Sequence, residues 1–367
     1  MIFRLTYNMA GCRKPMKRLW ISSMEESAIR DGFHNLRPGS DYDNLYHSAL
    51  CRQEADWLVG INGTRLFTVL YGGKALKVGR VQTPTLAMLV DRESKIMNFK
   101  KEAYYMAHII GNGLDAVSEH ISDKTEAERI AGACENGQAL VTSVIKEEKW
   151  VAPPKLYDLT TLQRDANRLF GFTAKQTLEY TQSLYEKKFT TYPRTDCNYI
   201  SEDMRGKVIA VVSKMVDREE YSERSRRLLG QALNFDSRVI NNKAMEGHDH
   251  HAIIPEENTD SLDRLTERER NVYHLVVNRL LCAVDKPYTY SETNYEFWCN
   301  DVTYKLKTVK PLEFGWKAYD TETDEANSSE LSFTEGSTFI PEDIHIKVCE
   351  TQPLKHFTDA SLLSVMN

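Results

Sequence analysis

Apolar residues recur at every third or fourth position through much of the first hundred residues, and this spacing predicts helices. It holds across residues 43–71, which predicts one long helix, and across residues 86–96, which predicts a second. Before them, the apolar run at residues 19–21 predicts a short buried strand. The first third of the chain is therefore expected to be mainly helical.

The helical spacing is lost between residues 102 and 150 and again between residues 286 and 350. The residues there predict strands, with one short helix inside the first segment. The strands are expected at residues 104–110, 139–145, 288–297, 302–310 and 344–350, and the helix at residues 127–133.

Five helices are predicted between these two segments. The second of them begins with a capping box formed by Thr173 and Gln176, ends at Lys187 and Lys188, and is followed closely by Tyr192. The expected helices span residues 159–169, 173–188, 201–215, 222–233 and 265–284.

The composition is that of a globular protein: 367 residues, 41% of them hydrophobic, are enough for two or three domains. Seven cysteines are scattered without a CxxC pair, which is typical of reduced thiols in a cytoplasmic protein. No signal-peptide pattern opens the chain and no apolar run approaches 18 residues, so a cytoplasmic location and no membrane partner are expected.

The net charge of -6 is unevenly distributed along the chain. Residues 1–101 hold 16 lysines and arginines against 9 acidic residues, whereas the remainder holds 31 against 44. Affinity for a polyanion is therefore expected at the N-terminal end, although ordinary solvated helix faces would give the same counts.

Residues 190–196, TTYPRTD, contain the clearest candidate for chemistry. Pro193 fixes its own φ angle and favours an extended Tyr192, so the phenol is expected at the boundary of an element. A tyrosine needs a cation or base to attack a phosphodiester at neutral pH, because its ordinary pKa is near 10. Arg194 is the candidate cation, since its planar guanidinium matches phosphate oxygens. Turn packing is the commoner role of a Tyr-Pro pair.

Residues 77–85, KVGRVQTPT, predict the start of a helix, with Thr83 as the N-cap and Pro84 as the first helical residue. A helix start offers unpaired amide donors and a positive dipole end. Gly79 permits close approach of a backbone, and Arg80 adds charge. The segment is either a phosphate contact or an ordinary capped helix with an exposed arginine.

Residues 247–255, GHDHHAIIP, hold three histidines and an aspartate. Such a cluster suits a metal ion or a proton donor to a phosphate. The adjacent His250 and His251 point in different directions in most conformations, which favours one functional histidine over a metal site.

The segments KVGRVQTPTLAML, SLYEKKFTTYPRTD and HHAIIP occur in this order, together with KRLWISSMEESAIRDGF and CRQEADWLVGINGTRLF. With them the chain resembles a type IA DNA topoisomerase of the topoisomerase III branch over essentially its whole length. The resemblance implies a multidomain α and β fold, a fragment of a toroid with a helical base, a strand-rich arch and a helical domain carrying the nucleophilic tyrosine. The domains implied are a Toprim remnant at residues 1–35, the first part of the base at 36–100, the first part of the arch at 101–154, the tyrosine domain at 155–284, the second part of the arch at 285–350 and the start of the returning base at 351–367.

The resemblance also implies a reaction. Tyr192 would attack a phosphodiester of single-stranded DNA to give a 5'-phosphotyrosine and a free 3'-hydroxyl, and the hydroxyl would reverse the attack after strand passage, without ATP. Arg194 would neutralise the phosphate and His250 would hydrogen-bond it. The residues implied in holding the single strand are Arg52, Asp56, Lys77, Val78, Gly79, Arg80, Val81, Gln82 and Thr195.

The chain departs from the family pattern at Cys197, where serine is usual, at Glu256, where threonine is common, and at His356 and Phe357, where an Arg-Tyr pair is usual. A larger departure is that the family's Toprim lysine and glutamate and its Mg2+-binding aspartates precede the point where this chain starts. The resemblance thus implies Mg2+ with its ligands outside this chain and no metal ligand within it. Single-stranded DNA and a separate Toprim chain are the implied partners, in a nucleoid-associated location.

Two other functions stay open from the sequence. The chain alone could be a catalytically inactive single-stranded DNA-binding fragment, which predicts salt-sensitive binding without cleavage. It could also be a metal-dependent rolling-circle nickase, a class that pairs a tyrosine with histidines. Histidines of that class usually alternate with apolar residues, whereas Asp249 stands between His248 and His250 here.

Overall fold

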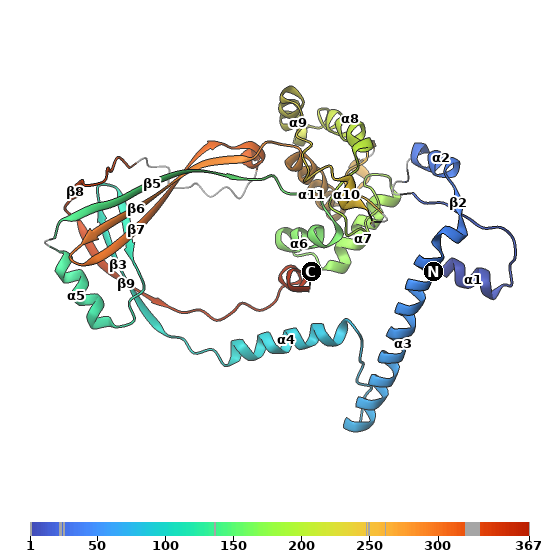
Figure 1. Ribbon diagram of the computed structural model, residues 1–367, viewed down its shortest axis with the longest axis horizontal. Coiled ribbons are helices and arrows are strands. Elements are labelled where there is room, and N and C mark those ends of the chain that lie inside the picture. The colour runs from blue at the N-terminus through green and yellow to red at the C-terminus, as the bar shows by residue number, and fades with distance from the viewer. Residues whose placement is uncertain are drawn as a thin grey trace.

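The computed structural model describes residues 2–21, 24, 26–135, 137–246, 248, 250–260, 262–319 and 331–366. Its elements are arranged as a ring: a β-sheet on the left, a group of helices at the upper right, and two long helices, α3 (Asp43–Tyr71) and α4 (Gln82–Met97), along the right and lower sides (Figure 1). None of the helices described is long and apolar enough to cross a membrane.

The first forty residues form small elements. These are α1 (Ile2–Met9), α2 (Glu26–His34), a 3-10 turn η1 (Gly39–Tyr42) and an antiparallel pair of two-residue strands, β1 (Lys17–Arg18) and β2 (Arg37–Pro38). The prediction of a buried strand at residues 19–21 is wrong, because the strand lies two residues earlier and both of its residues are exposed. Among the described residues β1 pairs with β2 alone, and a two-residue ribbon is too short to bury a face.

Helix α3 has the predicted bounds, but α4 begins at Gln82 and not at Pro84. The predicted N-cap, Thr83, lies inside the first turn, where its Oγ1 accepts the backbone N–H of Gly79 at 3.1 Å. Pro84 is tolerated there because N–H groups of the first turn have no partner within a helix.

The connection between these two helices is bound to the side of α3. The N–H of Val78 donates to Oγ1 of Thr64 at 3.0 Å, and the N–H of Leu76 donates to Oγ1 of Thr68 at 3.0 Å. A Cβ at Gly63 would lie 2.9 Å from Cγ1 of Val78, so the missing side chain allows this close approach.

The sheet has seven strands, all antiparallel to their neighbours, in the order β8-β5-β6-β7-β4-β3-β9. Both predicted strand-rich segments enter it, since β5 pairs with β6 and β3 pairs with β9. The five predicted strands are confirmed, and β4 and β8 were not expected. The strands are β3 (Ala103–Gly111), β4 (Leu114–Ser118), β5 (Ala139–Val151), β6 (Tyr288–Cys299), β7 (Val302–Glu313), β8 (Thr338–Phe339) and β9 (Asp343–Glu350).

A core of buried side chains, including Ile109, Phe297 and Tyr304, covers one face of the sheet, and α5 (Lys124–Cys134) packs against β3 and β9. The helix predicted at residues 127–133 is therefore confirmed, with slightly wider bounds.

The helices between the two sheet segments form a second core, built from side chains such as Leu162, Leu184 and Leu280. All five predicted helices are present, and Thr173 and Gln176 form the predicted capping box. The helices are α6 (Leu159–Phe170), α7 (Ala174–Glu186), α8 (Arg205–Met215), α9 (Glu219–Gln231), the short α10 (Asn242–Met245) and α11 (Glu267–Ala283).

The last residues connect the lower side of the ring to the helical group. Beyond β9 the chain passes along α4, where Nδ1 of His356 lies 2.7 Å from Oε1 of Glu93 and Arg92 stacks on the ring of Phe357. It ends in α12 (Asp359–Met366), which packs against α6. The two residues that depart from the family pattern here thus both contact α4.

Candidate active site

Two segments far apart in the sequence lie side by side at the candidate active site. Thr190 forms an antiparallel bridge with Pro255. The N–H of Thr191 donates to the carbonyl of Ile254 at 3.0 Å, and the N–H of Ile254 donates to Oγ1 of Thr191 at 3.0 Å. The TTYPRTD and HHAIIP segments are therefore one structural unit, which fixes Tyr192 against the histidine segment.

The rings of Tyr192 and His250 are in contact, with centroids 4.3 Å apart and a tilt of 40°. Tyr185 meets the edge of Tyr192 at 5.4 Å. Burial, helped by the nearby Tyr192 and Glu256, raises the pKa of Tyr185, so this neighbouring phenol stays protonated at neutral pH. Of the two tyrosines, Tyr192 is the one placed beside a histidine.

Further aromatic rings continue from His250 toward the N-terminal elements. The indole of Trp20 stacks on His250 at 5.8 Å, Tyr42 stacks on Trp20 at 5.5 Å, and the guanidinium of Arg18 lies over both Trp20 and Tyr42. We call Tyr42, Trp20, His250 and Tyr192 the aromatic column. Sequence reasoning missed it, because Trp20 was assigned to a buried strand and nothing local indicates a contact with residue 250.

A hollow of about 460 Å³ lies beside this contact. Its lining brings together three predicted site residues, Arg194, Thr195 and His250. Arg194 is exposed, so its guanidinium is accessible from solvent. A guanidinium and an imidazole on one hollow next to a phenol form an arrangement suited to a phosphate group.

The three histidines of this segment have different environments. Burial lowers the pKa of His251 to about 4, so its imidazole is neutral at pH 7. Its Nδ1 lies 2.7 Å from the carbonyl oxygen of Ala252 and is hydrogen-bonded to it. Nδ1 of His248 lies 2.8 Å from a carboxylate oxygen of Asp196. Only His250 faces the phenol, which favours the single functional histidine. The predicted cluster also includes Asp249, which lies outside the described residues.

Within the part of the chain that the structure describes, no three His, Cys, Asp or Glu side chains converge on a point that could hold a metal ion. These described residues therefore do not form a site for the Mg2+ that the family resemblance implies.

Thr195 is bound by the protein itself. Its hydroxyl donates to the carbonyl of His250 at 3.2 Å and accepts the N–H of Cys197 at 3.1 Å. Thr195 thereby fixes the distance between the Arg194 segment and the histidine segment. A direct contact of Thr195 with DNA stays a prediction.

The two departures from the family pattern near the site are both buried. The thiol of Cys197 donates to the carbonyl of Tyr199 at 3.5 Å, and burial raises its pKa, so it remains a thiol. Glu256 is fully buried, forms an ion pair with Lys207, and its N–H donates to the carbonyl of Phe189. Both residues support the backbone around the site.

The other predicted DNA contacts lie on the corner between α3 and α4, away from the helices that carry Tyr192 (Figure 1). Nε of Arg80 lies 2.6 Å from Oδ1 of Asp56, so these two predicted residues form an ion pair across the corner. Arg52 of α3 and Lys77 of the connection between the two helices are also exposed. The structure thus divides the predicted site residues into two groups and does not bring Arg80 to Tyr192.

The sequence pattern of a family described as DNA topoisomerase matches residues 40–367. The chain belongs to the type IA DNA topoisomerase family. It is 38% identical to DNA topoisomerase 3 of Bacillus licheniformis over 390 residues, which covers 100% of this chain and 52% of that protein. It is 36% identical to DNA topoisomerase 3 of Staphylococcus epidermidis over 370 residues, covering 100% of this chain and 51% of that one.

The fold comparison agrees with this topoisomerase assignment. The full-length topoisomerase I from Thermotoga maritima superimposes with a TM-score of 0.75 at 25% identity, over 95% of this chain and 57% of that one. The fold class expected from the resemblance, a fragment of a type IA topoisomerase, is therefore confirmed. The chain spans about half the length of the curated relatives it matches.

Proposed function

We propose that this chain supplies the DNA-cleaving tyrosine of a type IA DNA topoisomerase. One observation carries the proposal. In a chain of this family, the ring centroids of Tyr192 and His250 lie 4.3 Å apart, beside a hollow lined by Arg194.

In the proposed reaction, Oη of Tyr192 attacks the phosphorus of a phosphodiester in single-stranded DNA. A P–O bond to the phenol forms while the P–O3' bond breaks, so the strand is held as a 5'-phosphotyrosine. The phenol loses its proton and the leaving 3'-oxygen gains one, which leaves the number of protons unchanged. After another strand has passed, the 3'-hydroxyl attacks the phosphotyrosine and restores the strand without ATP.

The side chains around Tyr192 have distinct proposed roles. The Arg194 guanidinium neutralises the charge that develops on the phosphate oxygens, and His250 hydrogen-bonds the same group. The corner that contains Asp56 and Arg80, with the 77–82 segment, holds the single strand at a distance from the chemistry. Such backbone contacts make binding weaken steeply with salt.

We further propose that the chain acts with a Toprim domain and Mg2+, supplied by a separate chain or segment, in a nucleoid-associated complex. This part of the proposal rests on membership of the topoisomerase family.

The test uses a single-stranded oligonucleotide labelled at one end, incubated with the chain, Mg2+ and the Toprim domain of a relative, and stopped with detergent. A 5'-phosphotyrosine predicts that 3'-label migrates with the protein and that 5'-label is released as a shorter strand with a 3'-hydroxyl. Tyr192→Phe should give no adduct, whereas Tyr185→Phe, which changes the neighbouring ring, should keep it. An equal adduct yield from Tyr192→Phe would contradict the proposal.

The same experiment separates the alternative of an inactive DNA-binding fragment. That function predicts salt-sensitive binding of the oligonucleotide with no adduct from either labelled strand, even with the Toprim domain and Mg2+ present.

A further inference from the structure

Helix α12, at the end marked C in Figure 1, lies between the two groups of predicted site residues that the structure keeps apart. Its start contacts α6 and α7, the helices that lead to Tyr192. Its end contacts the start of α4, the helix that follows the Arg80 segment, where the hydroxyl of Thr85 lies 3.8 Å from Sδ of Met366. One short helix therefore joins the tyrosine site to the proposed DNA-holding corner.

Two hydrogen bonds at helix starts bind α12 to α6 and α7. A carboxylate oxygen of Asp359 accepts the N–H of Ala174, the first residue of α7, at 3.1 Å. In return, the side-chain oxygen of Asn167 in α6 accepts the N–H of Ala360 at 3.1 Å. Amides of a first helical turn have no partner within their own helix, and a carboxylate is favoured at the positive end of a helix dipole. Each bond thus pairs a donor that its own helix leaves open.

The groups that form these two bonds are themselves held in place. The side-chain amide of Asn167 also donates to the carbonyl of Phe172 at 3.0 Å, within the turn between α6 and α7. At the start of α12, the N–H of Thr358 donates to Oγ of Ser361 at 2.8 Å, and the N–H of Ser361 donates to Oγ1 of Thr358 at 3.1 Å. The contact therefore joins two capped helix starts, and it sets the direction of α12 relative to α7.

The position of α7 in turn affects the nucleophile. Tyr185, near the end of α7, meets the ring edge of Tyr192 at 5.4 Å. The N–H of Phe189 donates to the carbonyl of Leu184 at 2.9 Å, which binds the segment after the helix back to the helix. A shift of α7 should therefore move Tyr192 with it.

The segment that precedes α12 is bound along α4. Nη1 of Arg92 donates to the carbonyl of Lys355 at 3.0 Å, and Nδ1 of His356 lies 2.7 Å from Oε1 of Glu93. The contact of Met366 with the start of α4 lies at the other end of α12. Contacts before and at the end of α12 thus hold it to α4.

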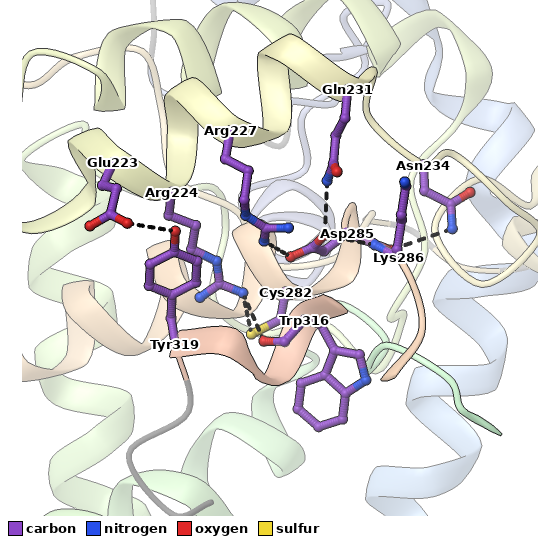
Figure 2. Close-up of polar contacts among 10 residues, drawn as sticks. All are labelled: Glu223, Arg224, Arg227, Gln231, Asn234, Cys282, Asp285, Lys286, Trp316 and Tyr319. Atoms are coloured by element: carbon purple, nitrogen blue, oxygen red, sulfur yellow. Dashed lines mark hydrogen bonds and ion pairs between the residues drawn. The ribbon is translucent and has the colours of Figure 1, made fainter. Parts of the chain in front are cut away.

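The helical group is also attached to the sheet, by contacts of a different kind (Figure 2). There the fully buried Asp285 forms an ion pair with Arg227 and accepts a hydrogen bond from Gln231 at 3.1 Å. Nε1 of Trp316 donates to the carbonyl of Val151, at the end of β5, at 3.1 Å. This attachment leads to the sheet and around the ring, whereas α12 leads directly to α4 (Figure 1). The shorter connection between the tyrosine helices and α4 is therefore α12.

We propose that α12 is a spacer that sets which phosphate of a strand held at the corner reaches Tyr192, with Asp359 as its positioning residue. This inference rests on the proposed cleavage function. A strand held at Arg80 and cut at Tyr192 spans two separate parts of the molecule, so the separation of those parts selects the phosphodiester that is cut. Loss of the Asp359 carboxylate frees α7 from α12, and the selected position becomes variable.

Mapping of the cleavage position tests the proposal on the full chain, with Mg2+ and the Toprim domain of a relative. The substrate is a 5'-labelled oligonucleotide whose hairpin stem stops the single strand from sliding, and the released fragment is sized on a sequencing gel. The unsubstituted chain should cut at one main position. Asp359→Ala should spread cleavage over neighbouring phosphates and lower the adduct yield by about 10-fold or more, because alignment is lost. Its affinity for the strand should stay unchanged.

Two further variants separate positioning from stability. Asp359→Asn keeps an acceptor oxygen for the N–H of Ala174 and should restore the single cleavage position. Asp285→Asn is the matched control, because it changes a carboxylate at the other attachment of the helical group. It should lower the melting temperature and keep the single position.

A distance measurement separates the spacer from the cleavage function. Spin labels at Ala87 of α4 and Glu179 of α7, both exposed, report the separation of the two parts by pulsed electron paramagnetic resonance. One narrow distribution that broadens in Asp359→Ala supports the spacer, and an unchanged distribution overturns it. Cleavage by Asp359→Ala at the same single position also overturns it. If the unsubstituted chain forms no adduct, the cleavage function fails, and the distance distribution alone decides for or against the spacer.

Discussion

Helices α11 and α3 are both long and regular, yet they differ in what they bury. In α11, nine of 17 residues are buried, whereas none of the 29 residues of α3 is. Apolar side chains of α3 such as Trp57, Leu66 and Val69 are more than half exposed. Most helical stability in proteins comes from packing of an apolar face. The tyrosine site therefore rests on its own core, while the proposed DNA-holding corner rests on a helix whose apolar side chains are largely exposed.

The strongest test of this contrast compares two leucines. Leu280 of α11 is 1% exposed and Leu58 of α3 is 51% exposed. Leu280→Ala should lower the free energy of unfolding by about 2–5 kcal/mol, because it leaves a cavity in the core. Leu58→Ala should change it by less than about 0.5 kcal/mol. Urea denaturation followed by circular dichroism measures both. A similar loss of unfolding free energy in the two variants would show that α3 is covered in solution and would contradict the difference in burial between α3 and α11.

A smaller effect is expected at Glu269, which joins the start of α11 to the end of α7 just before Tyr192. Its carboxylate completes the capping box with Thr266 and accepts hydrogen bonds from Ser183 and Lys187, both at 2.6 Å. Glu269→Gln should cost about 1–2 kcal/mol, since a mostly buried carboxylate with charged partners is lost. Glu267→Gln, an exposed change in the same helical turn, is the control and should cost little.

The pH dependence of Glu269 follows from its pKa. Burial alone raises that pKa, but the hydrogen bonds from Lys187 and Ser183 outweigh burial and lower it to about 2, from an ordinary value of 4.5. A carboxyl with a depressed folded pKa stabilises fully above its unfolded pKa. Its contribution should be present above pH 4.5 and disappear as the pH falls toward 2. Acid titration of the Glu269→Gln variant should lack this component, and an unchanged profile would contradict the assignment.

The smallest effect is expected at the α3–α4 corner. Arg80 and Asp56 are both substantially exposed, so Asp56→Asn should change stability by less than about 1 kcal/mol. It should tighten binding of single-stranded DNA, because Arg80 loses its protein counter-ion. Arg80→Gln should make the slope of log affinity against log salt shallower by about 0.7, the loss of one phosphate contact. Fluorescence anisotropy over a salt series measures both, and a slope unchanged in Arg80→Gln would remove this residue from the DNA contacts.

Sequence patterns predicted the elements best where local rules dominate. The bounds of α3 and the Thr173 capping box follow from spacing and capping chemistry within a few residues. The start of α4 was misplaced because two capping options compete locally, and the hydroxyl of Thr83 bonds backward to Gly79. The short strand near residue 17 depends on a partner twenty residues away, which no local pattern reveals.

Of the candidate site, the motifs predicted the proximity of Arg194, Thr195 and His250, which line one hollow. The environments of the histidines were not predictable, because the low pKa of His251 arises from burial by the tertiary fold.

The aromatic column also has a consequence for the order of folding. Contact between Trp20 and His250 closes a loop of 230 residues, and the entropy of closing so long a loop must be met before the contact stabilises anything. On a ribosome adding about 5–20 residues per second, Trp20 emerges on the order of 10–50 s before its partner ring. The helical core can form as a unit once its own residues emerge. The stacking of Trp20 on His250 beside Tyr192 should therefore form late, when the N-terminal segment docks onto that core.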